Sequence, residues 1–151
     1  FRQKGSYVFH ENEVIGMDSM PFTVECTKSA LGTKLFWSFA LKGEDAMTAF
    51  IEHSFQQARH LYTYLNSLED FYCPYPPESN ILCFQFCPDR LSDQDQLALR
   101  YELINSGAFY ITSCEFKGKR FLRTVLMNPD TKQQDFVALA NAITKIGDQI
   151  Q

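Results

Sequence analysis

The spacing of apolar and polar positions changes along this chain, and each change marks an expected element. Residues 29–42 present a wide apolar face at helical spacing, and Gly43 interrupts the pattern. Residues 44–68 carry the clearest helical period of the chain. Its apolar positions recur at steps of three and four: Met47, Phe50, Ile51, Ala58, Leu61, Tyr62, Leu65 and Leu68. We therefore expect two helices separated at Gly43.

The second half of the chain changes to shorter apolar runs. Four of these runs are typical of strands, and they cover residues 70–75, 80–87, 108–116 and 120–127. A helical pattern lies between the second and third run, and another follows the fourth. Short connections favour antiparallel neighbours, and a sheet with helices on one face buries the apolar positions economically. The pattern predicts an α/β (α+β) domain with an antiparallel sheet of about four strands.

Turn and capping residues delimit these elements. Ser92 followed by Asp95 resembles a capping box, and Gly107 suits the position after a helix end. Lys117-Gly118-Lys119 predicts the turn of a hairpin, and Asn128-Pro129 predicts a stop before the last helix. Residues 1–21 lack any clear period, and a loop of that length suggests a functional lid or a disordered segment.

Charge and composition exclude several functions. The net charge is −4, with a pI near 5.3, and the basic run 117–120 is interrupted by Gly118. This argues against nucleic-acid binding, which needs a concentrated basic face. No apolar stretch is long enough to span a bilayer, and the chain shows no signal peptide, so no membrane association is expected. Five cysteines at irregular spacing indicate reduced thiols in a cytoplasmic protein rather than disulfides or a metal site.

Two residues stand out as candidates for chemistry. Arg123 interrupts an apolar strand, where a charge is costly unless it is paired. It could form a salt bridge, reach solvent from an edge strand, or bind an anion such as a carboxylate. Tyr7 lies in the opening loop, where it could simply pack or could act as a mobile proton donor. His53 and His60 share one helix face without a third metal ligand, so packing or exposure is the better interpretation.

Several segments, in this order and spacing, resemble the group II pyridoxal-phosphate-dependent amino-acid decarboxylases, which include glutamate, aromatic-amino-acid and 2,4-diaminobutyrate decarboxylases. The segments that carry the resemblance are Gly5 to Phe9, Phe22 to Cys26, Lys34 to Trp37, Glu78 to Phe84 and Gly118 to Pro129. The resemblance covers essentially the whole chain and implies its C-terminal portion. Many relatives carry an Arg soon after the position of Cys26, where this chain has Thr27-Lys28.

The resemblance also implies roles for particular segments and residues, which the hydrophobic pattern alone does not. It implies part of an aspartate aminotransferase-like fold, with residues 1–43 ending the large cofactor-binding domain and carrying the catalytic loop, and residues 44–151 forming the small domain. The lysine that forms a Schiff base with pyridoxal 5′-phosphate is expected upstream of Phe1. Tyr7 falls on the loop tyrosine that protonates Cα after carbon dioxide leaves. Arg123 falls on the arginine that binds a substrate carboxylate.

The resemblance therefore implies a carboxy-lyase that acts on a small-molecule amino acid as a cytoplasmic homodimer. The 151-residue piece is expected to be inactive without the missing lysine. A different class stays open: a free-standing α/β module that binds or dimerises without chemistry.

Overall fold

The structure, a computed structural model, describes residues 30–150. Contacts between residues divide the chain into two compact units, Phe1–Glu44 and Asp45–Gln151. Helix α1 (Leu31–Asn66) crosses this boundary. Its backbone leaves the helical region at Gly43, with φ 77° and ψ 170°. Only glycine adopts a positive φ of this kind without steric cost. The helix break predicted at Gly43 is therefore confirmed.

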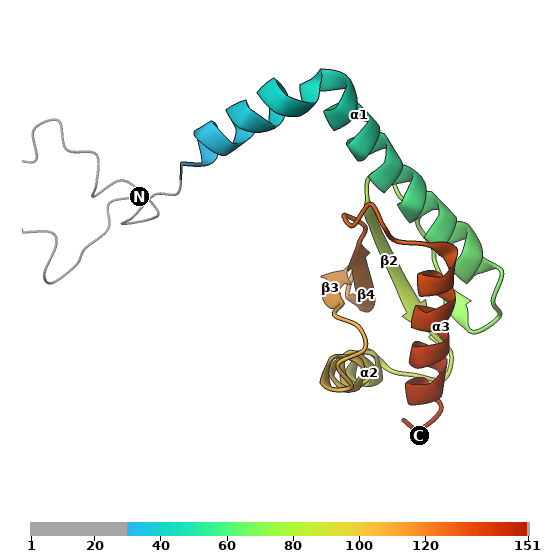
Figure 1. Cartoon of the computed structure of the whole chain (residues 1–151). Coiled ribbons are helices and arrows are strands. Elements are labelled where there is room, and N and C mark those ends of the chain that lie inside the picture. Colours follow the sequence, from blue (N-terminus) through green and yellow to red (C-terminus); the bar gives the residue numbers. More distant parts are fainter. Residues whose placement is uncertain (1–29, 151) are drawn as a thin grey trace, which may run out of the picture. The chain divides into compact units, whose positions relative to one another are not determined.

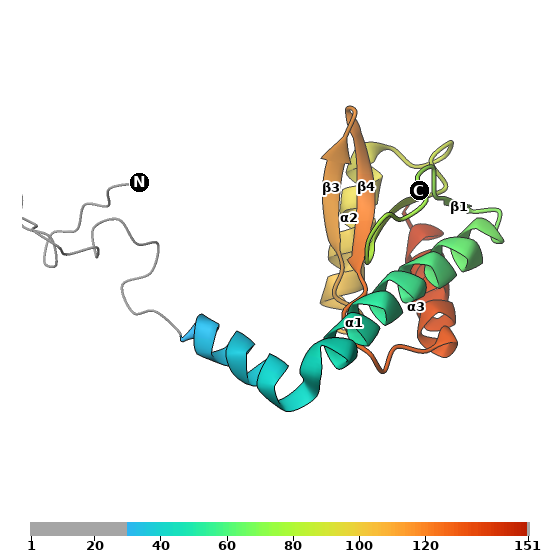
Figure 2. The ribbon, with the colours of Figure 1, turned by 90° about the horizontal axis from the view of Figure 1, so that it is seen from above.

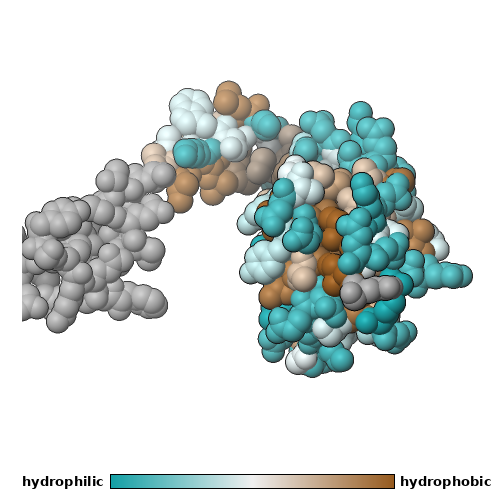
Figure 3. All heavy atoms as spheres, turned by 90° about the horizontal axis from the view of Figure 1, so that it is seen from below, coloured by the Kyte–Doolittle hydropathy of each residue, from teal (hydrophilic) through white to brown (hydrophobic). Residues whose placement is uncertain are grey.

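In the first unit, the described part of α1 carries many exposed apolar side chains, some of which are visible as brown spheres in Figure 3. They include Leu31, Leu35, Phe36, Trp37, Phe39 and Leu41. The rings of Phe36 and Trp37 meet edge to face, with centroids 5.5 Å apart. Exposed apolar area on this scale is typical of a surface that contacts another part of a protein.

The second unit begins with the rest of α1 and continues as a four-stranded sheet with two further helices (Figure 1). Its elements are β1 (Phe71–Tyr72), β2 (Ile81–Phe86), α2 (Asp93–Asn105), β3 (Thr112–Phe116), β4 (Lys119–Val125) and α3 (Gln133–Gly147). The strand order is β1-β2-β4-β3, and every neighbouring pair is antiparallel. The predicted element order and antiparallel sheet are confirmed.

One face of the sheet forms the core of this unit. Side chains on a strand alternate between the two faces, and Leu82, Phe84 and Leu122 are buried on the same face. The helices supply the opposing layer, with Leu61 and Leu65 from α1, Leu99 and Leu103 from α2, and Phe136 and Ile143 from α3. In Figure 2, α2 lies behind β3 and β4. The predicted one-sided helix layer is confirmed.

The opposite face of the sheet is more open. Cys83, Thr112, Cys114 and Arg123 point to this face and are half-buried. Phe121 and Gln85 are the exceptions, with 4% and 6% of their surfaces exposed. The ring of Tyr75, from the loop between β1 and β2, lies 6.3 Å from the Phe121 ring and helps to shield it.

Two strands are shorter than their sequence patterns predict. The run 70–75 pairs only at Phe71–Tyr72, and Pro74, which cannot donate to a ladder, follows soon after. The run 108–116 pairs only from Thr112. The carbonyl of Ile111 accepts a hydrogen bond from Arg100 Nε of α2 at 3.1 Å. At Ile111 a tertiary hydrogen bond thus takes the place of sheet pairing.

The hairpin turn between β3 and β4 contains two residues, whereas the sequence suggested three. Lys117 and Gly118 have φ of 51° and 72°, which is typical of a type I′ turn. Phe116 therefore pairs with Lys119, and Thr112 pairs with Arg123. A three-residue turn would have placed a different residue opposite Arg123.

Helix α2 is fixed at its start by side-chain hydrogen bonds. The predicted capping box is confirmed, since Ser92 and Asp95 each accept a hydrogen bond from the other's backbone N–H. Gln96, which is fully buried, donates to the Phe86 carbonyl at 2.6 Å and accepts from the Phe86 N–H at 3.2 Å. This amide joins α2 to the end of β2. Gly107 follows the helix with a φ of 73°, as expected.

Candidate functional site around Arg123

Arg123 lies in the middle of the sheet, on its more open face. Strand β4 has β2 on one side and β3 on the other, so the alternative of an edge-strand arginine is wrong. The ladder places Cys83 opposite Arg123 on one side and Thr112 opposite it on the other. The strand register therefore fixes the position on the sheet from which the Arg123 side chain extends.

The guanidinium of Arg123 has a hydroxyl partner. Its Nη1 lies 3.5 Å from Thr112 Oγ1, and the same hydroxyl donates to the Arg123 carbonyl at 3.2 Å. Among residues 30–150, no carboxylate forms an ion pair with Arg123, whereas Arg120 pairs with Glu115 at 3.3 Å and Arg90 with Asp148 at 3.2 Å. A half-buried cation without such a partner is suited to an anionic ligand.

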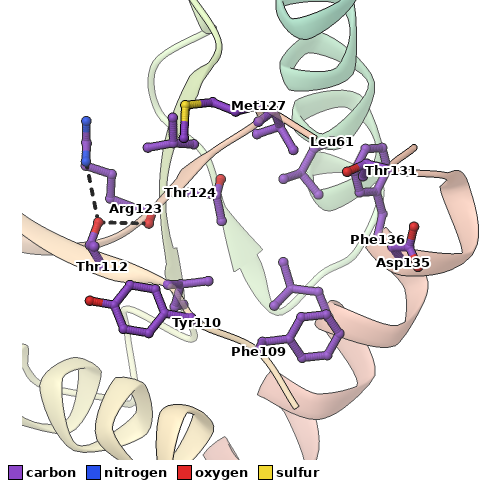
Figure 4. A pocket seen from close by; sticks show the side chains of 14 residues that line it. Leu61, Phe109, Tyr110, Thr112, Arg123, Thr124, Met127, Thr131, Asp135 and Phe136 are labelled. Atoms are coloured by element: carbon purple, nitrogen blue, oxygen red, sulfur yellow. Dashed lines mark hydrogen bonds between the residues drawn. The ribbon is translucent and has the colours of Figure 1, made fainter. Parts of the chain in front are cut away.

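A hollow of about 450 Å³ lies beside this arginine. Most of its lining is apolar and comes from α1, the segment before β3, the end of β4 and the start of α3, including Leu61, Phe109, Ile111, Phe136 and Leu139. In Figure 4 the side chain of Arg123 points away from Leu61 and Phe136 and towards Thr112. The charged group therefore stands at the rim, outside the apolar part.

Two thiols lie close to Arg123. The sulfurs of Cys83 and Cys114 are 3.6 Å apart. Burial, together with the hydrogen bond to Cys114, raises the pKa of Cys83 to about 11, although the positive charge of Arg123 acts in the opposite direction. At neutral pH the Cys83 thiol is therefore protonated and does not neutralise Arg123.

His53 and Gln57 hold the loop that follows β4. His53 Nε2 lies 3.2 Å from the Pro129 carbonyl, and Gln57 Nε2 donates to the Thr131 carbonyl at 2.9 Å. His60 is exposed. The interpretation of these histidines as packing or exposed residues is confirmed. Within residues 30–150, no three His, Cys, Asp or Glu side chains are placed to hold a metal ion.

The chemistry of these groups suits a carboxylate better than a covalently held aldehyde cofactor. No lysine lines the hollow, so its lining offers no amine for a Schiff base. Tyr7, the other candidate, lies outside the described residues.

The sequence did not single out Thr112 or the Cys83–Cys114 pair, because both depend on the sheet register. Over residues 30–150, the helices are all too short or too polar to cross a membrane.

No family model matches the chain. It is 18% identical over 162 aligned positions to the acidic amino acid decarboxylase GADL1 of Mus musculus, an alignment that covers 97% of this chain and 30% of that protein. The chain therefore spans less than a third of the length of this curated relative.

Solved structures give a consistent picture. The crystal structure of mouse CSAD matches with a TM-score of 0.72 and 22% identity, covering 86% of this chain and 30% of that one. The glutamate decarboxylase domain of a Vibrio parahaemolyticus protein matches with a TM-score of 0.71 and 20% identity, over 77% and 25% of the two chains. Catharanthus roseus tryptophan decarboxylase matches at 0.70 and 19%, over 87% and 29%.

These matches identify the class of fold: the chain has the same fold as a part of these decarboxylase structures. The resemblance to the group II pyridoxal-phosphate-dependent amino-acid decarboxylases is thereby confirmed over this chain.

Proposed function

We propose that this chain is the C-terminal part of a pyridoxal-phosphate-dependent L-amino-acid decarboxylase, which releases carbon dioxide and an amine. The observation that carries the proposal is the state of Arg123. It is a half-buried cation on an internal strand, and no carboxylate of residues 30–150 pairs with it. A guanidinium can bind a substrate carboxylate through two parallel hydrogen bonds.

The proposal assigns residues 1–43 to the end of the large cofactor-binding domain and residues 44–151 to the small domain. The lysine that binds pyridoxal 5′-phosphate belongs, in this account, to a segment before Phe1. The 151-residue chain alone should therefore be inactive. When bound, the cofactor supplies the electron sink for the carbon–carbon bond cleavage.

Arg123 would orient the substrate. Its backbone is held by hydrogen bonds to both neighbouring strands, and Thr112 limits the positions that its guanidinium can take. A carboxylate held by such a group cannot rotate freely, which lowers the entropic part of the barrier.

Tyr7 would complete the reaction by giving a proton to Cα after carbon dioxide has left. Its support is the match of Gly5 to Phe9 with the loop of the resembled family. A phenol is a suitable acid when it is carried on a loop that closes over the substrate. We further propose that the complete enzyme is a cytoplasmic homodimer.

A test needs the full-length protein that contains this chain, supplied with pyridoxal 5′-phosphate. Carbon dioxide release is measured with L-glutamate, L-aspartate, L-2,4-diaminobutyrate, L-tyrosine and L-tryptophan. The proposal expects one or more of them to release carbon dioxide and the matching amine in equal amounts. A folded full-length protein that binds the cofactor but decarboxylates none of a complete L-amino-acid set would contradict it and favour the non-catalytic module.

A further inference from the structure

Two cysteines from strands that are not neighbours meet on the open face of the sheet. Cys83 belongs to β2 and Cys114 to β3, and β4 lies between these strands. Their sulfurs are nevertheless only 3.6 Å apart. Leu122, which lies between Phe121 and Arg123 on β4, points into the core on the other face. The two thiols can therefore approach each other across the intervening strand.

This arrangement does not suit a disulfide bond. Neighbouring strands are separated by about 4.8 Å, and Cys83 and Cys114 lie opposite different residues of β4, Arg123 and Phe121. Their Cα atoms are therefore at least about 9 Å apart. A disulfide needs a Cα–Cα distance below about 7 Å. The central strand would have to leave the sheet before the sulfurs could bond directly. A third atom that bridges the sulfurs needs no such movement.

The sulfur spacing fits a bridging soft atom. Two sulfurs bound at about 2.3 Å to one pyramidal or tetrahedral centre, with an angle of about 100–110° between the bonds, lie about 3.5–3.8 Å apart, a range that includes the observed 3.6 Å. Thiolates are the preferred ligands of soft, thiophilic ions. Once one sulfur has bound, the second is already in reach, so the second bond forms at a high effective concentration.

We propose that Cys83 and Cys114 form a dithiol site that captures one thiophilic metalloid or metal centre, such as a trivalent arsenical. In the reaction with an organic arsenoxide, both S–H bonds break and two S–As bonds form. The arsenic–oxygen bond is cleaved, and the oxygen leaves as water with the two thiol protons. Arsenic stays trivalent, so no oxidant or reductant takes part.

The other described cysteines offer no comparable pair. Cys73 is buried, and desolvation raises its pKa to about 12. Cys87 is half-buried, and its thiol donates to Asp70 Oδ1 at 3.2 Å. Cys87 therefore serves as a matched single thiol on the same unit. The proposal is independent of the decarboxylase function, because it concerns sulfur chemistry alone.

The test uses phenylarsine oxide with the 151-residue chain, kept reduced by a phosphine. Intact mass spectrometry should show one arsenical that survives excess 2-mercaptoethanol and is removed by 2,3-dimercaptopropanol. Cys83→Ser and Cys114→Ser should each lose this retained adduct. Cys87→Ser and Cys26→Ser should keep it. Circular dichroism checks that each variant is folded.

A second measurement needs no variant. The wild-type chain is alkylated with iodoacetamide with and without one equivalent of phenylarsine oxide, and the modified peptides are quantified. Cys83 and Cys114 should both be protected by the arsenical, while Cys87 is alkylated as before. Equal alkylation of Cys83 and Cys114 under both conditions, or a retained adduct in folded Cys83→Ser, would overturn the proposal.

Discussion

Thr112 and Arg123 face each other across the β3–β4 ladder, and the Thr112 hydroxyl contacts Arg123 twice. It donates to the Arg123 carbonyl at 3.2 Å and lies 3.5 Å from Nη1. The hydroxyl thus links the backbone of the strand to its charged side chain. Arg123 is held beside its own strand before any ligand arrives, which reduces the entropy that binding must remove.

Thr112→Val tests this preorganisation, because valine keeps the shape and removes the hydroxyl. In the full-length protein we expect a KM several-fold above that of the wild type, with kcat less affected. The guanidinium–hydroxyl contact is long, at 3.5 Å, so we expect a loss of about 1 kcal/mol, which corresponds to about a fivefold change. Thr112→Ser restores the hydroxyl and should restore KM. Equal KM values for the valine and serine variants would show that the hydroxyl does not position Arg123.

Gln96→Leu tests the buried amide between α2 and β2. Leucine would leave the N–H and the carbonyl of Phe86 without their side-chain partner, and each unsatisfied buried group costs about 1–3 kcal/mol. We expect the free energy of unfolding of the 151-residue chain in urea to fall by about 2–6 kcal/mol. Gln94→Leu changes an exposed position of the same helix and is the matched control. Equal losses in both variants would contradict the assigned role.

Asp95→Asn tests the pH dependence of the α2 cap. Hydrogen bonds from the Ser92 hydroxyl and then from its backbone hold the pKa of Asp95 below its ordinary value. The unfolded chain therefore takes up the proton first as the pH falls. The stabilisation is fully present above about pH 4 and is lost below it.

We accordingly expect wild type and Asp95→Asn to differ in unfolding midpoint at pH 6 and to converge as the pH falls below about 4, through the lowered pKa of Asp95. Asp89→Asn, at an exposed position before the helix, should show no such convergence. A difference in unfolding midpoint between wild type and Asp95→Asn that stays constant with pH would show that the Asp95 carboxylate does not stabilise the helix cap.

Tyr7→Phe tests the proton donor. In the full-length protein the variant should keep the cofactor absorbance and bind substrate, because the phenol makes no proposed contact with either before carbon dioxide leaves. Amine formation should fall by about 10²-fold or more, the usual contribution of a positioned general acid. Tyr101→Phe, at an exposed position of α2, is the control. Unchanged amine formation in Tyr7→Phe would leave Tyr7 without a role in protonation.

Much of the fold could be predicted from the sequence because its signals are local. The break at Gly43, the cap at Ser92 and the hairpin near Gly118 each depend on the conformational preferences of a few neighbouring residues. Strand ends were less predictable. The sequence pattern of residues 108–111 is typical of a strand, but the Ile111 carbonyl accepts a hydrogen bond from Arg100 of α2. A local sequence pattern cannot predict a hydrogen bond between distant elements.

The candidate site was only partly predictable. Arg123 stood out because a charge in an apolar strand is unusual, whereas Thr112 and the paired thiols did not. Their positions depend on the hairpin register, and a turn of two residues rather than three decides which side chain stands opposite Arg123. The burial of that charge without a carboxylate partner among residues 30–150 emerges only from the packed sheet.

The central claim is that Arg123 binds a substrate carboxylate, and its most direct test is kcat/KM of Arg123→Gln in the full-length protein. Losing a charge-assisted pair costs about 2–5 kcal/mol, so we expect a decrease of at least about 30-fold. Arg120→Gln, on the same strand but paired with Glu115, should retain the wild-type value. A folded Arg123→Gln enzyme with wild-type kcat/KM would contradict the account.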